Sequence, residues 1–288
     1  LLVSGTDALS TQTLYRLNST DGSVEMLEAG FDPCDVTVWG DLIVFQGTDG
    51  ANGRELCSIP LTAPLKASNV TAWDIRAGAG SSCPTGFAAY DGKLYFSASN
   101  TVVIPGPKPL YVEDGYELWS WDGIAGPTVA ARLGTLAGVQ YDPSDLTVFE
   151  GELYFIGDLP GWTNPTGGIA RTLYRYTPAW GVTATATAPG EIDAAFANSD
   201  LRLSGTVQYG NSLALNYHSG AASYVVGYDG SFYPLTTTDQ NASIIGSGQD
   251  LYMMVQDAQL GWELGLYDGS LTVIDLNRGS VSGSPYAA

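Results

Sequence analysis

Two stretches, Gly92-Lys93-Leu94-Tyr95-Phe96-Ser97 and Tyr116-Glu117-Leu118-Trp119-Ser120-Trp121-Asp122-Gly123, define the unit from which this chain is built. Short runs of apolar and aromatic residues with polar neighbours are typical of β-strands. The closing Asp-Gly pair is a signal for a tight turn. The two stretches therefore predict adjacent strands of one antiparallel sheet, followed by a turn into a further strand.

The same pattern recurs along the chain. Its first part is anchored at six apolar positions, Leu1, Ile43, Leu94, Leu153, Leu213 and Leu251. Its second part is anchored at Leu14, Leu56, Leu118, Leu173, Val225 and Leu264. A further short run precedes the first part, as in residues 32–39 and 142–149, and another follows the second part, as in residues 271–274. Each unit is therefore expected to contain four strands.

Four short strands repeated at intervals of roughly 40 to 60 residues predict a β-propeller, because one small sheet cannot cover both of its own faces. The expected fold is all-β, a single domain that forms a six-bladed β-propeller of four-stranded antiparallel blades. The approximate blades are residues 1–28 plus 279–288, 29–74, 75–134, 135–191, 192–237 and 238–278. An open solenoid or two smaller sheets are the alternatives.

The two ends of the chain suggest how the ring closes. The first unit begins directly at its second strand, and residues 281–288 read like the beginning of a first strand. Joining the ends gives the same spacing from Leu251 to Leu1 as from Leu213 to Leu251. We therefore expect the N- and C-terminal strands to share one blade, which leaves no free inner edge.

The sequence Glu117-Leu118-Trp119-Ser120-Trp121-Asp122-Gly123 resembles the ELWxxDGT tandem repeat of exported bacterial proteins. Residues 263–269 keep this frame without the tryptophan, and Arg54-Glu55-Leu56-Cys57 has a cysteine in its place. The resemblance implies a repeat propeller that is secreted or displayed at the cell surface. It supplies no catalytic residues, so the aromatic residue and the Asp-Gly pair are expected to be structural.

The charge of the chain excludes some partners. Among 288 residues, 30 are acidic and 11 are Lys or Arg, which gives a net charge of −19. A field of this sign repels phosphate backbones and anionic membrane surfaces, so we expect no nucleic-acid partner. The sequence has no apolar run of about 18 residues, so no membrane insertion is expected either.

No cofactor is expected, and calcium is the metal that the sequence best suits. Acidic, glycine-containing loops occur at residues 48–55 and 111–115, but neither follows the EF-hand spacing, and both also read as turns with solvated charges. His218 is the only histidine, which disfavours zinc and Ser–His or Cys–His chemistry. Catalysis by a pair of carboxylates stays open, since acidic residues are abundant.

Three cysteines and three sequons are candidates for covalent chemistry. Cys34 and Cys83 lie at the beginnings of neighbouring blades, so we expect a disulfide between them, which would fit an oxidising compartment. Cys57 lies at a core position and is expected to be a buried thiol. The candidate glycosylation sites are Asn18, Asn69 and Asn241. In a chain this rich in Ser and Thr, about two sequons arise by chance.

Two neighbouring units carry proline-rich insertions between their second and third strands, residues 102–114 and 159–168. Proline reduces the entropy lost when a segment is ordered, so these insertions suit recognition. Loops of this kind share a face with the connections between blades, where binding sites commonly lie. The candidate ligand contacts are Trp162, Tyr111, Leu110, Asn164, Glu113 and Asp114. Alternatively, the insertions pack over their own blades.

Together these features predict an extracellular, non-enzymatic module for binding or adhesion. Its expected partner is a protein or a glycan at the cell exterior, or further copies of itself in a homo-oligomer or filament that builds a surface structure. Two alternatives remain. One is a propeller-type polysaccharide hydrolase that uses paired carboxylates, and the other is a calcium-dependent adhesin.

Overall fold

A computed structural model describes the chain except for residues 7–11, 28–29, 49, 105–109, 133–141, 164–168, 186–201, 220–221, 237–240, 249, 258–259 and 277–288. The described residues form 23 β-strands and one short 3-10 helix, η1 (Ala67–Asn69). Within this part of the chain, no helix has the length and apolar character needed to cross a membrane. The expected all-β class is therefore confirmed.

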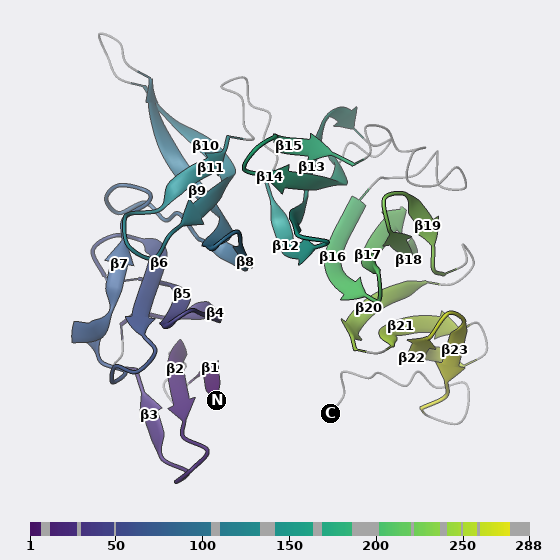
Figure 1. Ribbon diagram of the computed structural model, residues 1–288, viewed down its shortest axis with the longest axis horizontal. Helices are drawn as coiled ribbons and strands as arrows, with labels where there is room; N and C mark the ends of the chain where they lie inside the picture. The colour runs from purple at the N-terminus through teal and green to yellow at the C-terminus, as the bar shows by residue number, and fades with distance from the viewer. Residues whose placement is uncertain are drawn as a thin grey trace. The chain divides into compact units, whose positions relative to one another are not determined.

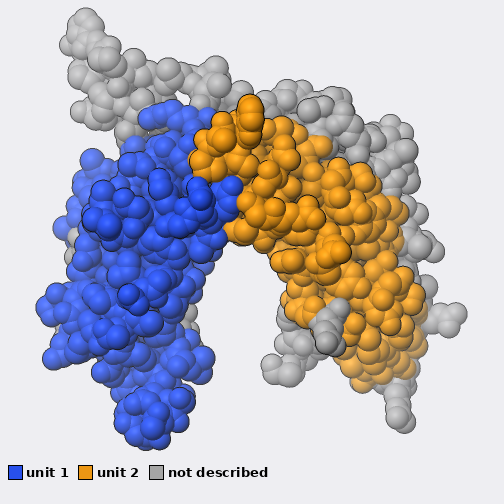
Figure 2. All heavy atoms as spheres, in the orientation of Figure 1, with its two compact units in different colours: residues 1–143 blue, residues 144–288 orange. Residues whose placement is uncertain are grey.

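The strands form six consecutive antiparallel sheets (Figure 1). The chain divides into two compact units, Leu1–Pro143 and Ser144–Ala288, which Figure 2 distinguishes by colour. The sheets of unit 1 are β1 (Leu2–Thr6), β2 (Gln12–Leu17) and β3 (Val24–Met26); then β4 (Cys34–Trp39), β5 (Leu42–Thr48), β6 (Arg54–Pro60) and β7 (Thr71–Trp73); then β8 (Thr85–Tyr90), β9 (Lys93–Ile104), β10 (Leu110–Trp121) and β11 (Thr128–Ala131).

Unit 2 contains the other three sheets. They are β12 (Ser144–Phe149), β13 (Glu152–Thr163), β14 (Ile169–Thr177) and β15 (Gly181–Ala184); then β16 (Arg202–Tyr209), β17 (Ser212–Ser219), β18 (Ala222–Tyr228) and β19 (Phe232–Pro234); then β20 (Ala242–Ser247), β21 (Leu251–Asp257), β22 (Gly261–Tyr267) and β23 (Leu271–Ile274). Every sheet pairs its strands in chain order. Six such meanders in succession are the blades of a β-propeller, as the repeats predict.

Five of these sheets have four strands, and the first has three among the described residues. The first sheet begins at β1, which corresponds to the second strand of the others. Residues 279–288, which we expect to complete it, lie outside the described residues. Closure of the ring by a shared terminal blade therefore stays a prediction.

Within each unit, the hydrophobic cores lie between consecutive sheets. In unit 1, one cluster joins Leu14 of the first sheet to Ile43 and Phe45 of the second. A second cluster joins Val44 of that second sheet to Trp121 of the third. Successive residues of β5 thus point to opposite neighbours, as the period of two in a strand requires. Unit 2 has the same arrangement, with separate clusters between its sheets.

The beginning of the first strand of a sheet has an unusual backbone. Asp32, Cys83 and Asp142 each precede a proline and have φ angles of 45°, 46° and 37°. Three residues further on, Asp35, Gly86 and Asp145 are also left-handed, with φ angles of 49°, 70° and 53°. The pairing register shifts at these points in β4, β8 and β12, which identifies a β-bulge. The repeat thus specifies a bulge as well as strands.

The bulge is also where neighbouring sheets are tied together. The Asp35 carboxylate accepts hydrogen bonds from Thr85 Oγ1 at 2.8 Å and from the Gly86 amide at 2.7 Å. In unit 2, Thr206 Oγ1 donates to the Asp145 carbonyl at 2.9 Å. Short polar links between the first strands therefore accompany the apolar packing between the sheets.

The Asp-Gly pairs of the repeat form the expected turns into the fourth strand. The Asp122 carboxylate accepts hydrogen bonds from the amides of Ile124 and Ala125, both at 2.9 Å. Gly123 has a φ of 82°, which an L-residue rarely adopts. These bonds lower the pKa of Asp122, because they favour its charged form. Asp21, Asp229 and Asp268 make similar bonds to Ser23, Ser231 and Ser270.

The glutamate of the repeat has a structural role. Glu55 is 1% exposed, and its carboxylate accepts hydrogen bonds from the Ile75 amide at 2.9 Å, the Ser82 amide at 3.0 Å and the Ser82 hydroxyl at 2.5 Å. It thereby ties β6 to the connection that leads into the next sheet. Glu263 is equally buried and accepts from the Leu276 amide at 2.7 Å. Burial raises the pKa of Glu55, while its hydrogen bonds oppose that rise.

We predict that Glu55→Gln changes how stability depends on pH. Because the pKa of Glu55 is raised in the folded protein, the folded state keeps its proton to higher pH than the unfolded chain does. The stability that this proton supplies is complete below the unfolded pKa and is lost as the pH rises through the folded pKa. As the pH rises above the ordinary glutamate pKa of 4.5, the free energy of unfolding of the wild type should therefore fall relative to that of Glu55→Gln.

Urea unfolding followed by tryptophan fluorescence at several pH values measures this difference. The control is Asp41→Asn, which removes an exposed carboxylate from a turn. A difference between wild type and Glu55→Gln that stays constant with pH, or that changes in the opposite direction, would contradict the prediction.

Substitutions of Asp35 should separate backbone strain from the link between sheets. Asp35→Ala loses the two hydrogen bonds and places a Cβ residue in the left-handed region, so it should lower the free energy of unfolding by about 2 kcal/mol. Asp35→Gly keeps the backbone conformation but loses the carboxylate, and Asp35→Asn keeps an acceptor. The loss measured by urea unfolding should decrease from Ala to Gly to Asn, and equal losses for all three would refute this account.

Candidate functional site

Unit 1 contains two polar cavities that the described residues line. The first has a volume of about 520 Å³ and lies between the first two sheets. The second has a volume of about 340 Å³ and lies where the third sheet meets the connections on either side of it. Volumes of about 300 to 1,000 Å³ are usual for small-molecule sites, so both cavities are candidates.

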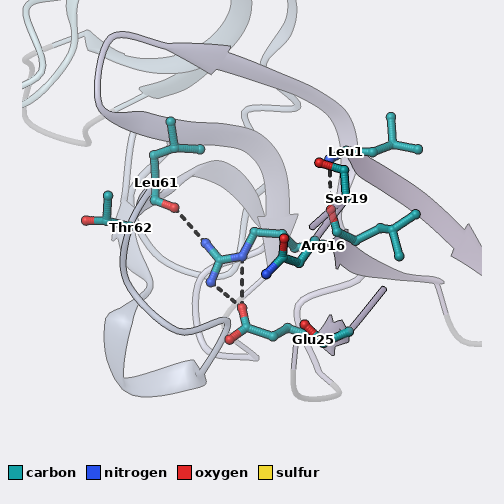
Figure 3. Close-up of a pocket in the computed structure, with 9 residues that line it drawn as sticks. Leu1, Arg16, Ser19, Glu25, Leu61 and Thr62 are labelled. Carbon is teal, nitrogen blue, oxygen red and sulfur yellow. Dashed lines mark hydrogen bonds and ion pairs between the residues drawn. The ribbon is translucent and has the colours of Figure 1, made fainter. Parts of the chain in front are cut away.

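The first cavity is organised by Arg16 of β2 (Figure 3). The Arg16 guanidinium forms an ion pair with Glu25, where Nε lies 2.8 Å from Oε2. It also donates to the carbonyls of Leu61 at 2.6 Å and Ala63 at 2.9 Å. Arg16 thus links the first sheet to the connection between β6 and β7. Since its donors are used in these bonds, we interpret Arg16 as a structural clamp.

The second cavity is lined by several polar and ionisable side chains. Its described lining is Arg76, Ser81, Cys83, Ser99, Gly115, Tyr116 and Asp142. These residues come from the connection after β7, from β9 and β10, and from the connection that precedes β12. One cation, one anion, a thiol, a phenol and two hydroxyls therefore line one small space, which we take as the candidate functional site.

Cys83 occupies a position that aspartate occupies in the neighbouring sheets. It precedes Pro84 with a φ of 46°, as Asp32 precedes Pro33 and Asp142 precedes Pro143. Left-handed backbone is uncommon outside glycine, and Asp and Asn adopt it several-fold more readily than other residues. A cysteine here is therefore a departure from the local rule. Departures of this kind cluster at functional sites.

Tyr116 of β10 lines the cavity together with Cys83. The backbone amide of Tyr116 donates to Asp142 Oδ1 at 3.3 Å. Burial is the main reason that the pKa of Tyr116 is raised, and Cys83 and Asp142 add to the rise. Arg76 opposes it. The phenol of Tyr116 therefore stays protonated, and the charges of Asp142 and Arg76 both act on it.

The equivalent positions of the preceding sheet hold two oppositely charged residues. There Arg54 corresponds to Tyr116, and Asp32 corresponds to Cys83. Arg54 and Asp32 form an ion pair, and Arg54 Nη1 also donates to the Asp32 carbonyl at 3.1 Å. The third sheet has a thiol and a phenol where the second has two opposite charges. This alignment within the repeat is the signal by which sequence reasoning could have found the site, and it was missed.

The expected disulfide between Cys34 and Cys83 is not formed, and all three cysteines are free thiols. The two residues are not at equivalent positions, since Cys34 follows Pro33 whereas Cys83 precedes Pro84. Cys34 Sγ instead donates to Gln46 Oε1 at 3.1 Å. Burial and then the Asp35 carboxylate raise the pKa of the Cys34 thiol. Cys57 is fully buried, as the sequence predicts.

The three sequon asparagines differ in their surroundings. Asn18 is exposed, and its Oδ1 accepts from the Thr20 amide at 2.9 Å. Asn69 Nδ2 donates to the Pro64 carbonyl at 2.9 Å. Asn241 Nδ2 donates to Gln256 Oε1 at 2.6 Å, and its Oδ1 accepts from the Ser223 amide. Glycosylation at any of them stays a prediction.

The insertions prolong two hairpins. The backbones of Leu110, Tyr111, Glu113 and Asp114 lie in β10, which pairs with β9 as far as Leu110 and Ile104. The backbone of Trp162 lies in β13. Asn164 and all of these side chains lie outside the described residues, so their role in ligand binding stays a prediction. Among the described residues, no group of three or more His, Cys, Asp or Glu is placed to hold a metal ion.

Comparison with known proteins shows the fold. No model of a protein family matches this chain, so the resemblance to the ELWxxDGT repeat is not confirmed, and no curated protein matches it. A solved structure, a puromycin-hydrolysing peptidase of Mycobacterium tuberculosis, is similar over 99% of this chain, with 16% identity and a TM-score of 0.58. This chain spans 45% of the length of that peptidase.

Two other solved structures are less similar. The β-propeller domain of the Trilobed protease from Pyrococcus furiosus has a TM-score of 0.45 and 11% identity, over 98% of this chain and 94% of its own. A gluconolactonase from Xanthomonas campestris has a TM-score of 0.45 and 14% identity, over 98% of this chain and 86% of its own.

The peptidase comparison corrects the expected function. We expected a non-enzymatic module for binding, adhesion or surface assembly, and hence no enzyme. This expectation is contradicted, because the fold of almost the whole chain occurs within a hydrolytic enzyme. The expectation relied on the lack of a catalytic motif in the sequence. Such a lack does not exclude an enzyme whose catalytic residues lie outside its propeller.

The thiols should react in an order set by their surroundings. Cys34 and Cys83 are both half-buried, but Cys83 lines the second cavity and Cys34 has a raised pKa, whereas Cys57 is fully buried. Because the thiolate is the reactive form, iodoacetamide should modify Cys83 first, Cys34 more slowly, and Cys57 only on unfolding. Peptide mass spectrometry over a time course, with and without urea, measures these rates. Labelling of Cys57 in the native protein as fast as that of Cys83 would contradict the described geometry.

Proposed function

We propose that this chain is the β-propeller part of a hydrolytic enzyme of the peptidase type. The observation that carries this proposal is the similarity to the puromycin-hydrolysing peptidase, which extends over 99% of this chain but 45% of that enzyme. The remaining length of that enzyme leaves room for catalytic groups outside the shared fold. By analogy, the machinery that cleaves the substrate of this protein lies beyond these 288 residues.

The requirements of amide hydrolysis support a catalytic site that lies outside this propeller. A serine or cysteine nucleophile needs a base within hydrogen-bonding reach, and histidine is the usual base. His218 is the only histidine of this chain, and its backbone lies in β17 opposite Arg202 and Ser223. The proposal therefore assigns the base to a part of the enzyme outside this chain.

Hydrolysis of polysaccharide by paired carboxylates is the less favoured alternative. That chemistry needs two carboxyl groups on either side of the bond that is cleaved. Among the described residues that line the second cavity, Asp142 is the carboxylate, and Glu55 is committed to the backbone of the neighbouring connection. The peptidase reading needs no such pair in this chain.

We predict that activity requires sequence beyond this chain and does not require His218. The gene product that carries this chain together with its flanking sequence should release a chromophore from aminoacyl and peptidyl amides and should cleave puromycin. The 288-residue chain alone should not. His218→Gln in the longer product should keep kcat within about threefold, whereas removal of a catalytic triad member costs about 10⁴-fold or more.

The controls decide between the two parts of the proposal. Thermal unfolding of His218→Gln verifies that the variant is folded. A longer product that is folded but cleaves no amide substrate would refute the peptidase assignment. A large loss of kcat in His218→Gln, or full activity of the 288-residue chain, would show that the catalytic base lies inside this chain.

A further inference from the structure

Asp-Gly pairs occur at several turns of this chain and are prone to one spontaneous reaction. The Gly amide nitrogen attacks the side-chain carboxyl carbon of the Asp, and water leaves, which forms a five-membered succinimide. Water then opens this ring at either carbonyl and gives Asp again or isoaspartate, in which the backbone runs through the side chain. Glycine permits the reaction because it has no Cβ to obstruct the closing ring.

The structure describes the Asp side chains of five such pairs, at residues 21, 91, 122, 229 and 268. The pairs at residues 49–50 and 114–115 have Asp side chains outside the described residues. All five described Asp residues are exposed, so exposure does not distinguish them. Their hydrogen bonds do.

Two of the five carboxylates are held by short hydrogen bonds. The Asp122 carboxylate accepts from the amides of Ile124 and Ala125, both at 2.9 Å. The Asp21 carboxylate accepts from the Ser23 amide at 2.9 Å and from the Ser23 hydroxyl at 2.7 Å. Cyclisation consumes the carboxylate, so the bonds to its charged form are lost on the way. These two pairs are therefore protected.

The same bonds keep these two carboxyl groups ionised. The Ser23 hydroxyl is the main group that lowers the pKa of Asp21, and backbone amides lower the pKa of Asp122. Cyclisation proceeds from the neutral acid, because its hydroxyl group has to leave as water. At the first pair the attacking nitrogen is engaged as well, since the Gly22 amide donates to the Asn18 carbonyl at 2.9 Å.

Two further carboxylates are held less tightly. Asp229 accepts from the Ser231 amide at 3.4 Å and from its hydroxyl at 3.3 Å. Asp268 accepts from the amide and the hydroxyl of Ser270, both at 3.3 Å. These distances exceed the usual range of about 2.7 to 3.2 Å for N–H donors, so the bonds are weaker. We expect these pairs to be protected only in part.

The turn between β8 and β9 has neither kind of protection. Tyr90 pairs with Lys93, so Asp91 and Gly92 form a two-residue turn, with φ angles of 46° and 70°. Within the described part of the chain, the Asp91 carboxylate accepts no hydrogen bond and the Gly92 amide donates none. Both reacting groups are therefore free.

The fold does not require aspartate in this turn. The corresponding turns of the second, fourth and fifth sheets contain Gly40-Asp41, Glu150-Gly151 and Gly210-Asn211. Glu150 and Gly151 have φ angles of 49° and 77°, close to those of the turn between β8 and β9. A glutamate is thus compatible with this backbone conformation.

We propose that Asp91-Gly92 is a site of spontaneous isoaspartate formation in the folded protein. Asp229 and Asp268 react more slowly, and Asp21 and Asp122 react last. The modification lengthens the backbone of the turn between β8 and β9 by one carbon atom. It does not depend on the proposed hydrolytic function.

Ageing of the 288-residue chain tests this order. The protein is kept for several weeks in mildly acidic buffer, and peptide mapping with fragmentation that distinguishes Asp from isoaspartate follows each pair. Isoaspartate should accumulate at Asp91 about tenfold faster than at Asp122 or more, the effect of losing a hydrogen bond to a charged group. Asp122 is the matched comparison, because it is equally exposed and lies in a turn of the same sheet.

The chain dissolved in guanidinium chloride gives the intrinsic rates, and there the five pairs should react at similar rates. Two variants test individual groups in the folded protein. Asp91→Glu keeps the charge and suits the backbone, but its cyclisation would need a six-membered ring, so the isomer at this turn should disappear. Ser23→Ala removes the hydroxyl bond of Asp21 and should speed isomerisation at Asp21 alone. Thermal unfolding verifies that both variants are folded.

Several outcomes would overturn the proposal. One is that Asp91 stays unmodified in the folded protein over a period in which it isomerises in guanidinium chloride. Another is that Asp21 and Asp122 react as fast as Asp91 in the folded protein. The order measured on the wild type decides even if a variant does not fold. Because no turnover is measured, this experiment can fail while the hydrolysis assay succeeds, and the reverse.

Discussion

A four-stranded sheet of this size is stable only if both of its faces are covered. In β5, Ile43 and Phe45 pack against the first sheet while Val44 packs against the third, and all three are fully buried. A strand with two buried faces has no exposed side on which to display reactive groups. The side chains in the middle of the strands are therefore buried between neighbouring sheets. Groups that could contact a ligand are left at the ends of the strands.

The ends of the strands are governed by a second set of rules. A left-handed residue before proline, a bulge three residues later, and a buried glutamate that accepts backbone amides recur from sheet to sheet. These devices satisfy polar backbone groups where the ladder of hydrogen bonds stops. They also hold a few side chains in fixed positions. The candidate site lies at one of these places, where Cys83 and Tyr116 replace the pair formed by Asp32 and Arg54.

The regular part of this fold could be predicted from the sequence. The apolar anchors, the Asp-Gly turns and the burial of Cys57 follow from local patterns, because alternation and turn chemistry act over a few residues. Whether a disulfide forms could not be predicted from local patterns. Whether Cys34 and Cys83 meet depends on a shift of two residues about a proline, and a spacing count does not reveal it. Cysteine itself gives no signal for the left-handed backbone of Cys83, which only the alignment of Cys83-Pro84 with Asp32-Pro33 and Asp142-Pro143 indicates.

The candidate site was missed for a related reason. Its residues are spread from Arg76 to Asp142, and no short motif joins them. The long insertions are the most prominent departures from the repeat, whereas the cavity is lined by strands of the third sheet and by the connections on either side of it. The expected non-enzymatic function was wrong because it relied on the lack of a catalytic motif. A repeat whose strands all cover one another has few residues left for a catalytic set. When such a fold belongs to an enzyme, its contribution is better sought in binding, at the places where the repeat departs from its own pattern.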